Sequence, residues 1–452
     1  MERYYHYLKI VVSAALQDAG EATRSLEIAK GIRDLCPPEI NLEIIFLSHE
    51  SKFEGKIVNN GFGIYKCEPK LEGIGFHADL KPSTNNFVGS EELTFELLKG
   101  EIQALKELEP HLIIHGFWPF ASLARRMVDK EIPGICFLPI PLEEDLYGSF
   151  LMKDIPDQIK LLTYLPAFLR RILIKAIPKT LKLKAPIMRQ GNIIKAAKVC
   201  GLRDIKLRNL FDMLKADLTI VNDLDEFYKE QKIPNNFKIV GPLYSPNEIN
   251  ADIDPLIKKV LQDSKSELKI FCTMGSSGTK KQLLEAIEAI VAVKDHKWNA
   301  LILAPPSICP LAEALDCAGN TEGIYITDKF VPAPLINSMV DIVVCHGGQG
   351  TVQTAIASGT PIVGVAMQPE QQINLDNIVL SGAGIRIPIH RWKASNIQTA
   401  IKTIQNSSSY RKSAEKLQKN IENIDGKRNS AEVIWKFIAD NIKISTSNCI
   451  RK

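Results

Sequence analysis

Short apolar runs alternate with helix-like patterns along this chain, and this alternation restricts its fold more than any other feature. The runs form two series. The first series is Leu8–Leu16, Asn41–Leu47, Leu112–His115, Gly134–Leu138, Leu218–Val221 and Lys238–Val240. The second series is Leu268–Met274, Asn299–Leu303, Gly323–Ile326, Ile342–Cys345 and Pro361–Val365. Strands separated by helices predict an α/β fold whose parallel sheets are covered on both faces.

The length of 452 residues predicts two domains, because a single core rarely grows beyond about 250–300 residues. The strand pattern breaks at the sequence VGPLYSP, which begins at Val240, and a polar stretch follows. We therefore expect an N-terminal domain at 1–240, a linker at 241–262, a C-terminal domain at 263–428 and a tail helix at 429–452. The insertion Lys70–Glu91 is typical of a loop, and the first helix is expected to begin at Thr23.

The composition is that of an ordinary globular protein, with 45% apolar and 24% charged residues. A formal net charge of +4 gives no general case for nucleic-acid binding. Nine cysteines are scattered without a CxxC pair, which indicates buried thiols in a reducing compartment. The N-terminus lacks the architecture of a signal peptide, and no apolar run approaches the ~18 residues of a spanning helix. We expect a cytoplasmic protein, at most peripheral to a membrane.

The stretch Leu151–Lys198 differs from the rest of the chain in charge. It holds eleven Lys or Arg residues and only two acidic ones, Asp154 and Asp157, for a local net charge of +9. Apolar residues are interleaved with these charges in LLTYLPAFLRRILIKAI, as in a basic amphipathic helix that could touch anionic lipid. The alternative is a solvated helix pair over the N-terminal sheet.

A glycine-rich loop follows the apolar run at 342–345, in the sequence HGGQGTVQTAIASGTP that begins at His346. A helix expected from about Thr351 to Ser358 would leave three glycines in the turn: Gly347, Gly348 and Gly350. Glycine lets backbone N–H groups approach a ligand without a Cβ in the way. The free amides of the first helical turn favour an anion. A diphosphate fits this arrangement, with His346 as a further donor, although a purely structural tight turn is the alternative.

Polar or aromatic side chains also follow three other predicted strands of the second series. The cluster Pro369–Asn374 offers a carboxylate and amides that could hold sugar hydroxyls. Phe330 and Val331 follow another strand, where an aromatic face could stack on a base. A small-residue turn offers a second phosphate contact through Gly275, Ser276, Ser277 and Gly278. Because the carboxyl ends of parallel strands meet at one edge, these loops predict a ligand site there.

The sequence from His346 to Ile387, HGGQGTVQTAIASGTPIVGVAMQPEQQINLDNIVLSGAGIRI, resembles the donor-binding signature of family-one glycosyltransferases. These GT-B enzymes include macrolide, flavonoid, glucuronosyl and sterol glycosyltransferases. The resemblance implies two Rossmann-like domains that face each other across a cleft, with the acceptor bound by the first and a nucleotide sugar by the second. It implies that Phe330 stacks on the base and that Val331 contacts the base through its backbone. The implied diphosphate and sugar contacts are His346, Gly348, Gly350 and Thr351 for the diphosphate, and Glu370 and Gln371 for the sugar.

Three positions depart from the pattern of this family. Thr354 stands where the family usually has a glutamate on the ribose, and the adjacent Gln353 points about 100° away around the helix. Glu21 stands where the family has its catalytic histidine, just before the first helix. The acid that orients this histidine is replaced by Gly116.

A base is still needed, because inverting transfer removes the acceptor proton as the hydroxyl attacks the anomeric carbon. Glu21 could serve if burial raises its pKa, and Asp18 is a second carboxylate in the same loop. His115, one position before Gly116, could be the base or could partner Glu21. The alternatives are a helix N-terminal carboxylate for Glu21 and a hydrogen-bonded strand-end histidine for His115.

These features together predict an inverting glycosyltransferase that moves a sugar from a UDP- or TDP-linked donor to a small or lipid-like acceptor. No cofactor beyond the nucleotide sugar is implied, and no metal, because the donor loops carry no DxD-like carboxylate cluster. Two alternatives remain open. One is a catalytically silent homologue that acts as a nucleotide-sugar-binding or partner subunit, and the other is a GT-B-fold nucleotide-sugar epimerase.

Overall fold

The protein forms two compact units, each built on its own parallel sheet. The computed structural model describes residues 5–184, 188–202, 207–244, 252–292, 298–443 and 446–447. Unit 1 comprises Met1–Gly148, Pro178–Leu243 and Asp425–Lys452. Unit 2 comprises Ser149–Ile177 and Tyr244–Ile424. The eight cysteines in the described ranges are all free thiols. None of the helices described is long and apolar enough to cross a membrane.

The sheet of unit 1 has parallel strands in the order β3-β2-β1-β4-β5-β6-β7. These strands are β1 (Tyr5–Ser13), β2 (Ile40–Ser48), β3 (Gly63–Lys66), β4 (Leu112–His115), β5 (Gly134–Leu138), β6 (Leu218–Val221) and β7 (Phe237–Ile239). The short β14 (Thr446–Ser447) pairs antiparallel with the start of β1. The strand order reverses between β1 and β4, so the loops that follow these two strands lie side by side.

Helices bury both faces of this sheet. They are α1 (Ala19–Asp34), α2 (Glu54–Asn59), α3 (Phe76–Leu80), α4 (Glu91–Leu108), α5 (Pro119–Ala124), α6 (Glu144–Leu146), α8 (Lys179–Lys182), α9 (Gly191–Val199), α10 (Leu210–Met213) and α19 (Gly426–Asn441). Ile10 and Val12 of β1 belong to the core beneath α1 and α19, whereas Val11 belongs to the core beneath α4 and α5. The alternation follows from the two-residue repeat of a strand.

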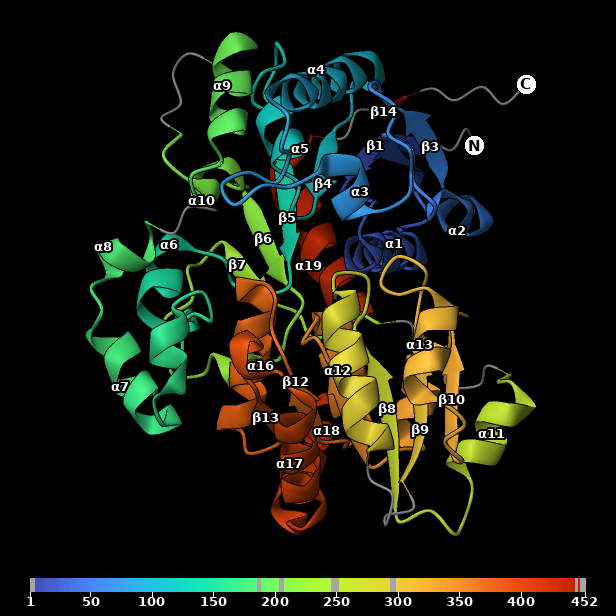
Figure 1. The fold of residues 1–452 in the computed structure, drawn as a ribbon. Helices are drawn as coiled ribbons and strands as arrows, with labels where there is room; N and C mark the ends of the chain where they lie inside the picture. The colour runs from blue at the N-terminus through green and yellow to red at the C-terminus, as the bar shows by residue number, and fades with distance from the viewer. Residues whose placement is uncertain are drawn as a thin grey trace. The chain divides into compact units, whose positions relative to one another are not determined.

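The last helix of the chain packs against the first (Figure 1). A Cβ at Gly31 of α1 would lie 2.7 Å from the backbone oxygen of Lys427, so glycine permits the close approach of α19. Trp435 donates its indole N–H to the carbonyl oxygen of Ile32 at 3.0 Å. Lys427 also pairs with Asp34 at 2.6 Å. Unit 1 therefore includes residues from both ends of the sequence.

The sheet of unit 2 has parallel strands in the order β10-β9-β8-β11-β12-β13. They are β8 (Leu268–Thr273), β9 (Trp298–Leu303), β10 (Ile324–Thr327), β11 (Ile342–Cys345), β12 (Ile362–Gly364) and β13 (Gly384–Arg386). The helices are α7 (Ala167–Ala176), α11 (Pro255–Leu261), α12 (Lys280–Val291), α13 (Leu311–Ala318), α14 (Ala333–Ser338), α15 (Gln349–Ala357), α16 (Pro369–Leu380), α17 (Ala394–Gln405) and α18 (Ser408–Ile421). Every residue of β11 is buried, as expected for a strand covered on both faces.

Three local expectations differ from the structure. Helix α1 begins at Ala19 rather than Thr23, because the Asp18 side chain accepts hydrogen bonds from the N–H groups of Gly20 and Glu21 and so starts the helix earlier. The expected linker 241–262 contains α11, whose apolar side buries Ile257 and Leu261. The expected loop Lys70–Glu91 contains the short helix α3.

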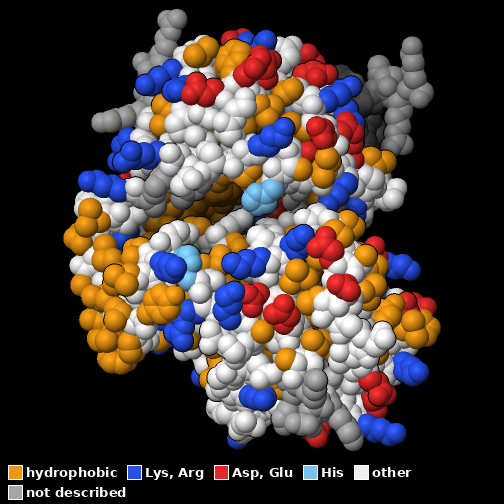
Figure 2. All heavy atoms as spheres, viewed as in Figure 1, with side chains coloured by type: hydrophobic (Ala, Val, Ile, Leu, Met, Phe, Trp, Pro, Cys, Tyr) orange, Lys and Arg blue, Asp and Glu red, His pale blue; other side chains and the backbone are white. Residues whose placement is uncertain are grey.

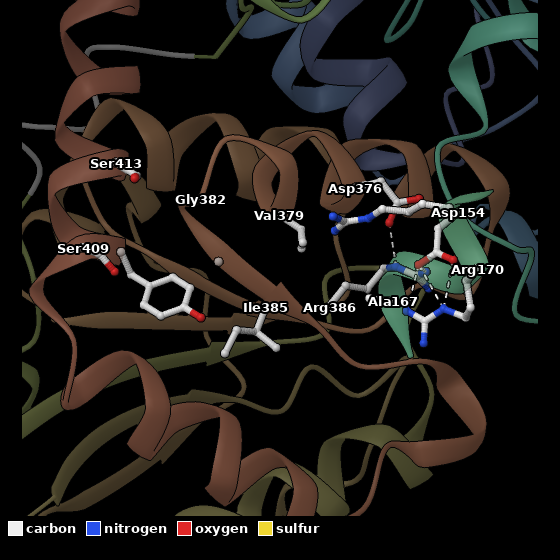
Figure 3. Close-up of a pocket in the computed structure, with 13 residues that line it drawn as sticks. Asp154, Ala167, Arg170, Asp376, Val379, Gly382, Ile385, Arg386, Ser409 and Ser413 are labelled. Atoms are coloured by element: carbon white, nitrogen blue, oxygen red, sulfur yellow. Dashed lines mark hydrogen bonds and ion pairs between the residues drawn. The ribbon is translucent and has the colours of Figure 1, made fainter. Parts of the chain in front are cut away.

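The basic stretch is divided between the two units, which differs from both its expected domain and its expected packing. Residues Ser149–Ile177 belong to unit 2, although they precede most of it by about 70 residues. Apolar side chains gather over α7 in Figure 2, and a set of buried charges lies on its inner side (Figure 3). The segment therefore packs against the C-terminal sheet rather than the N-terminal one.

Those buried charges form a network centred on Arg386 of β13. Its guanidinium lies 2.7 Å from a carboxylate oxygen of each of Asp154, Asp157 and Asp376. Asp154 is also paired with Arg170 of α7 at 2.8 Å. A pocket of about 420 Å³ adjoins the network beneath α7, but its lining does not include the glycine-rich loop. Two arginines are thus paired with three carboxylates, and these ion pairs fix the segment to unit 2.

Candidate functional site

The predicted ligand loops lie at the carboxyl edge of the sheet in unit 2. The strand order reverses between β8 and β11, so the loops after these strands flank the point where open α/β sheets bind ligands. The first of these loops contains Gly275 and the second contains His346 and Gly348. The sequence therefore placed these three residues at the correct edge.

The imidazole of His346 lies between two glycines. A Cβ at Gly275 would lie 2.3 Å from Cε1 of His346, and a Cβ at Gly348 would lie 2.3 Å from its Nε2. Gly275 also has a φ of +57°, which disfavours any side chain there. Neither position accepts a side chain without moving the histidine. The glycines thus hold His346 at the mouth of both loops.

Helix α15 begins at Gln349 rather than at about Thr351, so Gly350 lies in its first turn and not in the loop, and this turn has no side-chain cap. Gly348 is the N-cap residue, and the amides of Gly350 and Thr351 follow within the first turn. A Cβ at Gly350 would meet nothing within 4 Å, so the space in front of this turn is open. Uncapped amides at the positive end of a helix dipole favour an anion.

We expect Gly348→Ala to weaken the binding of a nucleoside diphosphate by about 10- to 100-fold. The reason is that a shift of the hydrogen-bonding groups of a site by about 1 Å can cost up to that factor. The added methyl group must displace His346 from its place between the loops. Calorimetric titration with UDP and TDP measures the effect. Gly55→Ala, in helix α2 of unit 1, is the control, since its methyl group also has open space and its binding should stay near the wild-type value. Equal losses in both variants would contradict the role of the His346 position.

Phe330 presents an aromatic ring to solvent at the same edge of the sheet, in the loop that follows β10. It lies between β10 and α14 and is 81% exposed, whereas the adjacent Val331 is buried. A ligand group that covered this ring would gain free energy by removing its apolar surface from water. The ring is therefore available for stacking on a planar ligand group.

The two residues expected at the sugar differ in their exposure. Glu370 is half-buried in the first turn of α16, and its carboxylate accepts a hydrogen bond from Asn374 at 2.6 Å. Gln371 is buried, donates to Ser277 at 2.8 Å and accepts from the N–H of Met367 at 2.9 Å. Gln371 thus ties the loop after β8 to α16, and Glu370 is the one of the two that reaches solvent.

Thr354, at the ribose position, faces the interior of unit 2. Its hydroxyl donates to the carbonyl oxygen of Gly350 at 2.9 Å and accepts from the side chain of Asn337 at 3.0 Å. The adjacent Gln353 is also buried. Neither side chain faces the open space in front of α15, so a ribose would have to be held by other groups.

In unit 1, Glu21 joins the loops that follow β1 and β4. Its carboxylate pairs with Arg24 at 2.7 Å and accepts the N–H of Phe117 at 3.0 Å. A Cβ at Gly116 would lie only 1.7 Å from this carboxylate, so Glu21 fills the space beside that glycine. Burial raises the pKa of Glu21 although Arg24 opposes the shift. The side chain is 4% exposed and is directed into the unit rather than toward solvent.

His115 and Asp18 have opposite surroundings. His115 is fully buried, and its Nδ1 lies 3.0 Å from the carbonyl oxygen of Gly116. Asp18 is half-buried at the start of α1, and both of its hydrogen bonds to the helix go to the same oxygen, Oδ1. Among the three expected catalytic residues, Asp18 is therefore the one whose carboxylate reaches solvent.

Comparison with known proteins finds a family model that matches part of the chain and solved structures that share its fold. Residues 320–439 match the family described as "Erythromycin biosynthesis protein CIII-like, C-terminal domain". The calicheamicin glycosyltransferase CalG4 superposes with a TM-score of 0.62 at 14% identity, over 97% of this chain and 99% of that one. The UGT2 of Phytolacca americana was solved with UDP-2fluoro-glucose and pterostilbene. It superposes with a TM-score of 0.65 at 16% identity, over 96% of this chain and 99% of that one. The chain therefore has the GT-B fold of these solved glycosyltransferase structures.

Curated relatives resemble part of this GT-B protein. A PGL/p-HBAD biosynthesis glycosyltransferase of Mycobacterium tuberculosis (strain ATCC 25177 / H37Ra) is 25% identical over 202 residues, which are 44% of this chain and 43% of the relative. A PGL/p-HBAD biosynthesis rhamnosyltransferase of Mycobacterium bovis (strain BCG / Pasteur 1173P2) is 27% identical over 203 residues, 44% of this chain and 41% of the relative. The chain thus spans less than half the length of the curated relatives it matches. In the described ranges of the GT-B protein, no group of three or more His, Cys, Asp or Glu residues could hold a metal ion.

The buried histidine gives the GT-B protein a predicted acid sensitivity. Burial, with Arg125 and Arg126 nearby, lowers the pKa of His115 from 6.5 to about 3. Between these values the unfolded chain binds a proton that the folded chain does not, so the free energy of unfolding falls as the pH drops. His115→Leu removes this contribution, up to about 4 kcal/mol, and should flatten the pH dependence between pH 6.5 and 4. Urea unfolding of both proteins across this range measures the slope, and identical slopes would contradict the prediction.

Proposed function

We propose that this chain is an inverting glycosyltransferase that moves a sugar from a UDP- or TDP-linked donor to a hydroxyl of a small or lipid-like acceptor. The observation that carries the proposal is the uncapped start of α15 at the strand-order reversal, with His346 held between two glycines. The glycosyltransferase names of the relatives support it. A related rhamnosyltransferase, SpnG, has been solved with thymidine diphosphate.

The donor is bound through its three parts. The diphosphate lies before the first turn of α15, where the amides of Gly350 and Thr351 and the ring of His346 stabilise its negative charge. Gly275 and Ser276 contribute the loop after β8 to the same phosphates. Phe330 stacks on the base beside the backbone of Val331. Glu370 accepts hydrogen bonds from the sugar hydroxyls.

The acceptor is activated at the loop after β1. Asp18 takes the hydroxyl proton through the oxygen that does not cap α1, and the acceptor oxygen then forms a bond to the anomeric carbon. The bond from that carbon to the diphosphate oxygen breaks at the same time, and the nucleoside diphosphate leaves with the electron pair. Attack opposite the leaving group inverts the anomeric configuration. Glu21 supports this loop by joining it to the backbone at Phe117.

The direct test is calorimetric titration with UDP-, TDP- and GDP-sugars, followed by mass spectrometry of the products. One donor should bind and release its sugar to water or to an added hydroxyl acceptor. Failure of every donor to bind would overturn the proposal.

Phe330→Ala should weaken nucleotide binding by about 10- to 100-fold, because stacking of a base on an aromatic ring contributes about 1–3 kcal/mol. Its stability should not change, since the ring is 81% exposed. Titration with UDP and TDP measures the effect. Leu315→Ala, which removes another exposed apolar side chain of unit 2, is the matched control and should bind normally. If Phe330→Ala binds UDP and TDP as wild type does, Phe330 does not stack on the base.

A silent homologue is the second candidate, and the burial of both Glu21 and His115 favours it. Such a protein would bind a nucleotide sugar without consuming it. Tight donor binding with no product, over a panel of phenolic, aliphatic and sugar hydroxyl acceptors, would select this candidate. A product formed from the donor with no acceptor and no released sugar would select the epimerase.

A further inference from the structure

Seven large apolar side chains of the segment Ser149–Ile177 are exposed, and four of them are more than half exposed. These four are Leu161, Tyr164, Phe168 and Ile172, with exposures of 81%, 56%, 62% and 61%. Figure 2 shows hydrophobic side chains gathered over the position of α7 at the left of the view. We call these four residues the α7 surface.

The helical repeat places the most exposed residues of α7 on the side opposite its buried ones. Arg170 and Ile174, four residues apart, are the buried residues of α7. Phe168 and Ile172, also four residues apart, lie on the opposite side. A helix on a protein surface normally carries polar residues there. Large exposed apolar patches mark interaction sites in soluble proteins.

The exposed charge around this surface has a single sign. Lys160, Arg171 and Lys175 are at least partly exposed. The acidic residues of Ser149–Ile177 are Asp154 and Asp157, and both are buried against arginines. The segment therefore presents apolar side chains bordered by cations, with its negative charges turned inward.

We propose that the α7 surface docks on an anionic lipid bilayer. Apolar side chains enter the boundary between head groups and acyl chains, while lysine and arginine extend to the phosphates. Each cation near an anionic bilayer adds to the attraction. Association with another protein is less consistent with this composition, because the centre of such interfaces is depleted in lysine.

The buried network makes this docking a property of the whole unit. Arg170 and Arg386 join α7 to β13 through Asp154, so α7 cannot leave the sheet without exposing paired charges. A bilayer that binds α7 therefore binds unit 2, including its donor loops. The proposal does not depend on the proposed function, although it would bring the enzyme to a lipid-like acceptor.

The test is co-sedimentation of the full chain with vesicles of phosphatidylcholine alone or mixed with phosphatidylglycerol. Wild type should bind the mixed vesicles at low ionic strength at least about tenfold more tightly than the neutral ones. Binding should weaken in about 1 M salt, where the Debye length is about 3 Å. Phe168→Ser combined with Ile172→Ser should lower binding at least about tenfold, because two side chains no longer leave water. Lys160→Glu combined with Lys175→Glu should abolish the preference for anionic vesicles.

The matched control is Leu315→Ser combined with Leu380→Ser, which alters two exposed leucines elsewhere in unit 2 and should bind as wild type does. Thermal unfolding and titration with UDP confirm that each variant is folded, so that loss of docking is distinguished from loss of the donor site. Equal vesicle binding by wild type and the Phe168/Ile172 variant would overturn the proposal. So would a concentration-dependent dimer in sedimentation velocity that this variant abolishes, since a second copy would then cover the surface.

Discussion

Replacing Arg386 by methionine is expected to destabilise unit 2 by about 3–5 kcal/mol, the usual cost of removing one partner from a buried ion pair. The methionine fills similar space but leaves Asp157 and Asp376 buried without their cation, and Asp154 with Arg170 alone. Hydrogen exchange read by mass spectrometry measures the loss separately in peptides of each unit. Peptides from 149–177 should lose protection most, because the network fixes this segment.

The same variant should recover stability in mild acid. Burial already raises the pKa of Asp376 to about 6, and loss of the arginine must raise it further. A protonated carboxyl tolerates burial far better than a charged one. The difference in the free energy of unfolding between variant and wild type should therefore become smaller as the pH falls from 7.5 to 5.

Lys393→Met is the control for this prediction. Lys393 and its partner Glu285 form an ion pair in which the lysine is exposed, and such pairs contribute at most about 1 kcal/mol. Its loss should change the free energy of unfolding by less than that amount. If Arg386→Met unfolds as wild type does at pH 7.5, the network does not hold the segment in place.

Asp18→Asn is expected to slow sugar transfer by about 10²- to 10⁴-fold, the usual contribution of a general base. Asparagine caps a helix about as well as aspartate, so α1 should still begin at Ala19 and the unfolding midpoint should hardly move. The measurement is a rate of product formation at saturating donor, together with donor affinity by calorimetry. The affinity should stay unchanged, because the contacts proposed for the donor come from Phe330, the loops after β8 and β11 and the start of α16, and not from Asp18.

Glu21→Gln is the companion variant, and its expected result is different. The substitution leaves Arg24 without its charged partner inside unit 1, so it should lower stability by about 3 kcal/mol or more. Its rate, corrected for the folded fraction, should fall less than that of Asp18→Asn. If Asp18→Asn transfers sugar at the wild-type rate while Glu21→Gln is stable but inactive, Glu21 and not Asp18 is the base.

The strands could be predicted well because buried parallel strands are continuous apolar runs. Leu112–His115, Gly134–Leu138, Leu218–Val221 and Ile342–Cys345 were predicted with their observed bounds. The strands β3 and β13 were missed, since Gly63–Lys66 is half-exposed and Gly384–Arg386 contains a charged residue. A buried arginine in a strand can be predicted only when the carboxylates that pair with it are known, and those of Arg386 lie in distant parts of the sequence or on another element.

The donor loops could be predicted because their chemistry is local in sequence. Strand, glycines and helix follow one another from β11 to α15, so spacing alone places His346 and the amides together. The residues near the proposed base could not be placed this way. Glu21 contacts the backbone at Phe117, 96 positions away, and nothing in either stretch indicates that its carboxylate fills the space beside Gly116. Likewise, the inward roles of Gln371 and Thr354 depend on Ser277 and Asn337, which are distant in sequence.

The order of the segments has a consequence for how the polypeptide is made. Helix α19 is synthesised about 390 residues after α1, yet it packs against α1. The apolar face of unit 1 that includes Ile32 therefore stays partly exposed until Ile434 and Ile438 have been translated. Residues 149–177 likewise lack their ion-pair partner until Arg386 has been translated. A product that lacks α19 would thus expose the apolar side of α1 and would be a substrate for chaperones and proteases.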